Sequence, residues 1–141
     1  MSRVLAFDYG LKRVGVSVTD SLQIIANTLE TVETKRIFDF IKSYCAKEDV
    51  ECFVVGYPYA HGHTQNQIVV PIEKFIAELN KLYPDKLVHK IDESFTSKIA
   101  QRTLLQSGVN KSERRKRGNI DAISSNLILQ TYLETKSNQF R

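Results

Sequence analysis

Residues 4–18 constrain the fold of this chain more than any other stretch. They read VLAFDYGLKRVGVSV, in which an apolar run ends at Asp8 and a second run alternates valine with small residues. This pattern predicts two β-strands around a tight turn, because Gly10 and Gly15 permit a sharp hairpin or a close chain approach. Asp8 then ends a buried strand, where a lone carboxylate is costly unless it is paired or bound to metal. The alternative is an aspartate that hydrogen-bonds its own turn.

The remainder of the chain alternates helical and extended patterns. They predict, in order, a strand over residues 24–32, a helix over 35–47, a strand over 52–55, a polar loop over 57–67, a helix over 68–82, a strand over 87–91, a helix over 96–106, a basic segment over 110–118 and a helix over 119–134. This order predicts an α/β fold with a mixed sheet. No repeat or linker divides it, so we expect one domain over residues 1–141.

Individual residues set the expected boundaries. Thr34 is placed to cap the first helix, and Gly56 and Pro58 to end the strand over residues 52–55. Beyond Lys136 the chain is polar, and we expect it to fray. The expected buried stripes are Ile72, Phe75, Ile76 and Leu79 in the helix over 68–82, and Ile120, Ile123, Leu127 and Ile128 in the last helix.

Composition indicates a globular protein. Hydrophobic residues make up 42% and charged residues 26% of the 141 residues, and no apolar run approaches the length that spans a bilayer. We therefore expect no association with a membrane. Cys45 and Cys52 form no metal-type pair and no disulfide framework, which favours a reducing, cytoplasmic location. The formal net charge of +4 mildly favours a polyanionic partner.

Two further carboxylates fall where α/β folds build their sites. Glu93 follows a predicted strand, and Asp121 lies in the first turn of the last helix. The alternatives are a solvated strand end and a favourable charge at a helix N-terminus. If both converge on Asp8, the three carboxylates supply the oxygen ligands that suit Mg²⁺ or Mn²⁺ and not zinc. Ser124 and Ser125 are small enough to let the last helix lie close to the sheet.

Four ordered motifs are similar to those of the YqgF/RuvX family, the pre-16S rRNA nucleases also described as Holliday-junction resolvase-like proteins. DYGLKRVGV at residues 8–16 resembles its opening motif, VGYP at 55–58 its V-G-x-P segment, DESFTS at 92–97 its D-E-x-x-T-[TS] motif, and DAISS at 121–125 its D-x-x-[AS]-[AS] helix. The resemblance covers essentially the entire chain. The chain departs from the family at Ser94, where arginine is common, and in the loop that reads AHGH over residues 60–63.

The resemblance implies an RNase H-like fold with a mixed five-stranded sheet flanked by helices. It also implies that Asp8, Glu93 and Asp121 are the catalytic and metal-binding residues of a nuclease that uses Mg²⁺ or Mn²⁺. Two such ions activate water and stabilise charge on the attacking and leaving oxygens. The expected substrate is the 5′ end of pre-16S rRNA, and the alternatives are branched DNA or a non-catalytic nucleic-acid-binding role. The sequence leaves open RNA against DNA, endonuclease against exonuclease, and monomer against homodimer.

Basic and aromatic residues near these acids are candidate contacts with nucleic acid. A cluster before Asp121 and a pair beside Asp8 are expected to bind phosphates, and the polar loop offers rings that stack on unpaired bases. The alternative for each is solvated surface. The candidates are Lys12, Arg13, Tyr59, His61, Lys111, Arg114, Arg115, Lys116 and Arg117.

Two nucleotide-binding folds fit the chain less well. An Asp-x-Gly strand turn also opens actin-like and sugar-kinase ATPases, but those need a second phosphate-binding hairpin and a second domain, for which 141 residues leave no room. The segment from Gly10 to Gly15 is not a P-loop, because Val16 stands where lysine is required.

Overall fold

Five strands form one mixed sheet in the order β3-β2-β1-β4-β5, in a computed structural model that describes residues 2–58, 66–92 and 117–139. Central β1 pairs antiparallel with β2 and parallel with β4, and β5 extends the parallel half. The mixed five-stranded sheet predicted from the sequence is therefore confirmed. The strands are β1 (Arg3–Tyr9), β2 (Arg13–Thr19), β3 (Ala26–Glu33), β4 (Val50–Tyr57) and β5 (Leu87–Asp92); the helices are η1 (Thr34–Arg36), α1 (Ile37–Lys47), α2 (Asn66–Leu82) and α5 (Arg117–Gln139).

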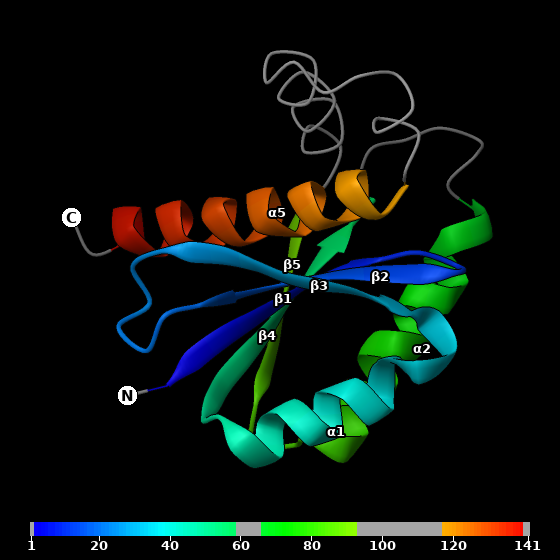
Figure 1. The fold of residues 1–141 in the computed structure, drawn as a ribbon, viewed down its shortest axis with the longest axis horizontal. Coiled ribbons are helices and arrows are strands. Elements are labelled where there is room, and N and C mark those ends of the chain that lie inside the picture. The colour runs from blue at the N-terminus through cyan, green and yellow to red at the C-terminus, as the bar shows by residue number, and fades with distance from the viewer. Residues whose placement is uncertain (1, 59–65, 93–116, 140–141) are drawn as a thin grey trace.

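Helices cover both faces of the sheet, α1 and α2 on one face and α5 on the other (Figure 1). Because side chains of a strand alternate between faces, the apolar run of β1 serves two cores. Leu5 and Phe7 belong to the core under α1 and α2, while Val4 and Ala6 belong to the core under α5. This double coverage explains why β1 reads as a continuous apolar run rather than an alternating one.

The α1 and α2 side holds the larger, aromatic core. The ring of Phe7 lies 5.9 Å from that of Phe53 and 5.5 Å from that of Phe75, centroid to centroid. The apolar stripe predicted for the helix over residues 68–82 is buried there as expected, and it consists of Ile72, Phe75, Ile76 and Leu79. Pro71 lies inside α2, in its second turn, where its missing N–H removes one i→i−4 hydrogen bond of the helix.

The hairpin between β1 and β2 requires glycine at its first corner. The N–H of Gly10 donates to the carbonyl of Arg13 at 2.8 Å, which leaves only Leu11 and Lys12 in the turn. A Cβ at position 10 would lie 2.6 Å from that same carbonyl oxygen, closer than van der Waals contact allows. The predicted tight turn is confirmed, and it places β2 directly beside the end of β1.

We expect Gly10→Ala to open this turn. The backbone of Arg13 must move to accept the methyl group, at a cost of about 1–3 kcal/mol in the free energy of unfolding. Denaturant titration of the two proteins measures the loss. Leu11→Ala, an exposed change in the same turn, is the control and should alter stability by less than about 0.5 kcal/mol. Equal stabilities for Gly10→Ala and the parent would contradict the assignment.

The first helix begins later than predicted. Thr34 does not cap α1; its hydroxyl donates to the carbonyl of Gly10 at 2.7 Å, and its N–H donates to the carbonyl of Lys12. Residues 34–36 form the short η1, and α1 starts at Ile37 without a side-chain cap. Thr34 bonds to the β1–β2 turn, and not to the helix, because the end of β3 lies beside that turn.

Two strand boundaries also differ from the prediction. The strand expected over residues 24–32 begins at Ala26, because the carboxylate of Asp20 accepts the N–H groups of Ile24 and Ile25 and holds them in a turn. These bonds lower the pKa of Asp20. Gly56 does not end β4, which continues to Tyr57 and stops at Pro58. Because the strand includes Gly56, this glycine lies inside the sheet.

Helix α5 is longer than predicted and buries a different stripe. It runs from Arg117 to Gln139, so the tail expected to fray at Lys136 is helical, and Lys136 forms an ion pair with Glu51 at 3.7 Å. Of the predicted stripe Ile128 is buried, Ile123 and Leu127 are only half-buried, and Ile120 lies outside the described side chains. The buried face consists of Ser124, Ser125, Ile128, Leu129 and Tyr132.

Candidate functional site

Asp8 is half-buried near the carboxyl end of β1, on the face that α5 covers. Its orientation follows from strand alternation, since Val4 and Ala6, two and four residues earlier, belong to the core under α5. Tyr9 points the other way, with its ring 4.8 Å from that of Phe75, and burial raises its pKa. Asp8 is thus presented toward α5 by a rigid central strand.

Glycines flank Asp8 on both neighbouring strands. On β2 its direct partner is Gly15, and on β4 the register that pairs Phe7 with Val55 brings Gly56 level with Asp8. Both glycines are buried and lie on the α5 face, because Ser17 and Val54, two residues away in each strand, contact α5 or its core. Neither neighbouring strand therefore places a side chain directly beside the Asp8 carboxylate on this face of the sheet.

Helix α5 crosses this face antiparallel to β1. The hydroxyls of Ser125 and Ser17 lie 2.7 Å apart, level with Ala6, whereas Lys136 reaches Glu51 at the opposite, amino end of the parallel strands. The amino-terminal half of α5 therefore lies toward the end of the sheet that carries Asp8 (Figure 1). Polar contacts fix this placement further, since the Asn126 side chain donates to the carbonyl of Ala26 at 2.9 Å.

The backbone at Asp121 lies near the level of Asp8. Asp121 precedes Ser125 by four residues, a rise of about 6 Å along a helix. From Ala6 to Asp8 the strand advances about 7 Å in the same direction. The sequence placed Asp121 in the first turn of its helix, but α5 begins at Arg117, so the residue falls in the second turn. Its side chain lies outside the described part of the chain.

A polar cluster holds the neighbouring strand ends against α2. The hydroxyl of Tyr57 donates to a carboxylate oxygen of Glu73 at 2.6 Å, and the Nζ of Lys90 lies 3.3 Å from the same oxygen and 4.6 Å from the centroid of the Tyr57 ring. The hydrogen bond from Tyr57, followed by that from Lys90, lowers the pKa of Glu73. The cluster therefore ties β4 to α2 at Tyr57, one residue before Pro58, and β5 to α2 at Lys90, two residues before Asp92.

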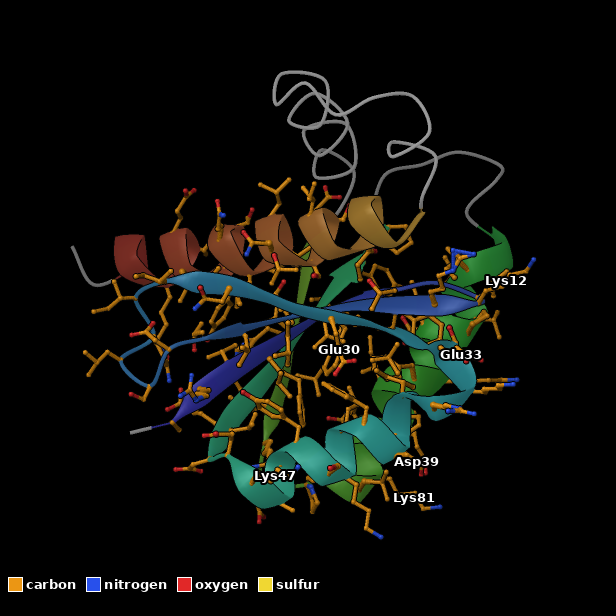
Figure 2. The ribbon with its side chains drawn as sticks, in the orientation of Figure 1. Lys12, Glu30, Glu33, Asp39, Lys47 and Lys81 are labelled. Carbon is orange, nitrogen blue, oxygen red and sulfur yellow. The ribbon has the colours of Figure 1, made fainter. Side chains whose placement is uncertain are left out.

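The remaining candidates divide between described and undescribed parts of the chain. Lys12 is exposed at the tip of the β1–β2 hairpin (Figure 2), and Arg13 opens β2. Arg117 was predicted in a basic loop, but it is the first residue of α5, whose first turn also accommodates Gly118. Outside the described residues lie Glu93, Tyr59, His61, Lys111, Arg114, Arg115 and Lys116.

Among the described residues no three His, Cys, Asp or Glu side chains come together as a ready-made metal site. The donor chemistry at Asp8 still suits a hard divalent cation, because the side chain is a carboxylate in a glycine-lined, half-buried position. Sequence reasoning named Gly15 for close chain approach and Gly56 as a strand end, but it missed that the two glycines flank Asp8. The signal for this was present, since both glycines interrupt apolar strand runs, and such glycines mark close approach of a ligand or another backbone.

Comparison with known sequences places relatives along the whole chain. Residues 2–135 match the model of the RuvX family, described as Holliday junction resolvase. A protein of Bacteroides thetaiotaomicron is 45% identical over 136 residues, covering 96% of this chain and 99% of the relative. Proteins of Phocaeicola vulgatus and Flavobacterium johnsoniae are 46% and 43% identical, covering 96% of this chain and 98% and 99% of their own lengths. All three are provisionally named pre-16S rRNA nucleases.

Among solved structures, T. thermophilus RuvC in complex with a Holliday junction substrate is similar, with a TM-score of 0.57, 16% sequence identity and coverage of 96% of both chains. At this identity the likeness establishes the fold, which is RNase H-like, as the sequence motifs predicted. Within the described residues, no helix combines the length and apolar character needed to cross a membrane.

Proposed function

Because this chain belongs to the RuvX family, we propose that it is a divalent-metal-dependent nuclease that processes the 5′ end of pre-16S rRNA. Family membership makes it a hydrolase of phosphodiester bonds; the metal and the substrate are the proposal. One observation carries it: Asp8 stands between Gly15 and Gly56 on the face covered by α5, and Asp121 belongs to that helix. Relatives at 41–46% identity that carry the pre-16S name support the substrate.

We assign Asp8, Glu93 and Asp121 to the metal site. Glu93 directly follows β5, whose carboxyl end lies at the same edge of the sheet as that of β1, because β1, β4 and β5 are parallel. When bound, Mg²⁺ or Mn²⁺ supplies Lewis acidity and a nucleophilic water for in-line phosphodiester hydrolysis. The protein's part is to hold carboxylate oxygens rigidly and to keep the sheet surface beside Asp8 open to a phosphate.

The test of this function is a cleavage assay on three substrates in parallel. Pre-16S rRNA 5′ fragments, unstructured single-stranded RNA and four-way DNA junctions are incubated with Mg²⁺, with Mn²⁺ or with EDTA. We expect metal-dependent cleavage of the pre-rRNA fragment. Cleavage of the junction alone would favour the second candidate, a branched-DNA resolvase, which the description of the matching family model supports. Binding without cleavage of any substrate would leave a non-catalytic nucleic-acid-binding protein.

We further propose that cations on two segments bind the nucleic-acid backbone. One segment is the hairpin tip with Lys12 and Arg13, and the other contains Lys111, Arg114, Arg115, Lys116 and Arg117 and leads into α5. The hairpin tip lies at the end of the sheet that presents Asp8, and the second segment precedes in sequence the helix that covers this face. Loop residues Tyr59 and His61 remain candidates for stacking on unpaired bases.

Salt dependence of binding distinguishes these contacts from solvated surface. Each phosphate contact contributes about 0.7–0.9 to the slope of log affinity against log salt concentration. We expect Arg114, Arg115 and Arg117 replaced together by glutamine to flatten that slope by roughly two units, with similar losses for unrelated sequences because phosphate contacts carry no sequence information. Fluorescence anisotropy at several salt concentrations measures it. If the slope is unchanged in this variant but flattened in the double variant Lys12→Gln/Arg13→Gln, the phosphate contacts lie on the hairpin instead.

A further inference from the structure

The hydroxyl of Ser124 stands out among the buried polar groups of α5. Ser124 is 1% exposed, yet its Oγ has no hydrogen-bond partner among the described residues. Ser125, the next residue, is equally buried, but its hydroxyl meets that of Ser17 at 2.7 Å. The two adjacent serines are thus both buried, but only the hydroxyl of Ser125 has a hydrogen-bond partner among the described residues.

An unsatisfied buried hydroxyl needs an explanation. Burying it without a partner costs free energy, and alanine would occupy the same space in the helix with a better helix propensity and no polar atom to desolvate. Such groups are rare in folded proteins, and they are accounted for by catalytic roles or by waters and ions that the polar atom binds. Close packing of α5 on the sheet explains why residue 124 is small, but it does not explain the oxygen.

The position of Ser124 points to the site around Asp8. Side chains of a helix lean toward its amino terminus, so the hydroxyl of Ser124 is directed to the turn that contains Asp121, three residues earlier. That end of α5 lies at the end of the sheet where Asp8 stands between Gly15 and Gly56. The orphan hydroxyl therefore lies toward the part of the α5 face where both strands beside Asp8 carry glycine.

We propose that Ser124 is a positioning residue whose hydroxyl holds a water molecule at the carboxylate site. The hydroxyl donates one hydrogen bond to, or accepts one from, a water bound beside Asp8, and in this way it orients the carboxylates and the water shell that receive the divalent ion. This inference rests on the proposed function and assigns it a residue that does not itself ligate the ion.

The test compares Ser124→Ala with Ser125→Ala in the full chain. Melting temperature of the metal-free protein, Mn²⁺ affinity by isothermal titration calorimetry, and cleavage rate are measured for both. For Ser124→Ala we expect an unchanged or higher melting temperature together with about 10-fold weaker Mn²⁺ binding, the size of effect seen when a group that orients metal ligands is lost. For Ser125→Ala we expect the reverse order of effects, a lower melting temperature with a smaller change in Mn²⁺ affinity, since its hydroxyl serves Ser17.

Two outcomes would overturn the inference. A melting temperature that falls in Ser124→Ala as it does in Ser125→Ala would show that the hydroxyl has a structural partner. Unchanged Mn²⁺ affinity in Ser124→Ala would show that it does not serve the site. Ser124→Thr, which keeps the hydroxyl, should retain more of the Mn²⁺ affinity than the alanine variant does. Failure of the parent protein to bind Mn²⁺ would instead refute the proposed metal site, so the two failures are distinguishable.

Discussion

Asp8→Asn should lower the rate of phosphodiester cleavage by at least about 10²–10³-fold, the loss typical when one group that stabilises transition-state charge is removed. Asparagine keeps the shape of the side chain at the end of β1 but has no charge with which to hold a divalent ion. Because Asp8 is half-buried on a sheet surface lined by Gly15 and Gly56, the fold has little reason to change. Cleavage assays at saturating metal measure the rate, and thermal unfolding tests the fold.

The control for this prediction is Asp39→Asn. Asp39 is an exposed carboxylate in the first turn of α1, on the side of the sheet away from α5 (Figure 2). Asp39→Asn makes the same change of charge as Asp8→Asn. It should leave the cleavage rate within about twofold of the parent, because surface substitutions away from special features have small effects. Cleavage by Asp8→Asn at more than a tenth of the parent rate would refute the role of Asp8.

Phe7→Ala should have the opposite phenotype, although Phe7 is the adjacent residue. Its fully buried ring packs against Phe53 and Phe75 in the core under α1 and α2. Removing a buried phenylalanine costs about 3–5 kcal/mol in the free energy of unfolding, which for a chain of this size lowers the melting temperature by roughly 10–20 °C. Calorimetry or denaturant titration measures the loss, and the fraction that remains folded at low temperature should still cleave.

Phe38→Ala is the matched control for this loss. Phe38 also contacts Phe75, at 5.4 Å between ring centroids, but it is only half-buried on α1. Its replacement leaves a cavity open to solvent, so we expect a smaller loss of stability than that of Phe7→Ala. Equal losses for the two variants would mean that the ring of Phe7 is not at the centre of this core.

Local patterns predicted the sheet and one helix face because they report on burial directly. The apolar run before Asp8 and the valines after Gly10 could only form adjacent buried strands, and residues 72–79 show helical spacing without competing signals. Thr34 was mispredicted for a different reason. A threonine before a helix normally caps it, but here the turn of the β1–β2 hairpin comes within reach and takes its hydroxyl. A contact across 24 residues of sequence leaves no local signal.

The prediction of the buried face of α5 was wrong in part because hydrophobicity was used as a guide to burial. Leu127 was assigned to the core and is only half-buried, whereas Ser124 and Ser125 lie against the sheet, as their small size had led us to expect. Close approach of a helix to a strand favours small side chains, even polar ones, when a partner such as Ser17 faces them. At the site, the sequence correctly set Asp8 at a strand end, while Glu93 remains a prediction.

The packing of α5 over strands that precede it in the sequence also governs the order in which the fold can form during synthesis. Helix α5 follows all the strands that the structure describes, yet it packs over the face that carries Val4, Ala6, Cys52 and Val54. At the usual rate of translation, roughly 2–10 s separate synthesis of the end of β5 from that of the end of α5. During this interval an apolar strip on the nascent chain is bare and open to aggregation or to chaperones. Because Asp121 lies on a helix that follows the described strands, we expect a nascent chain that ends before α5 to lack part of the proposed site.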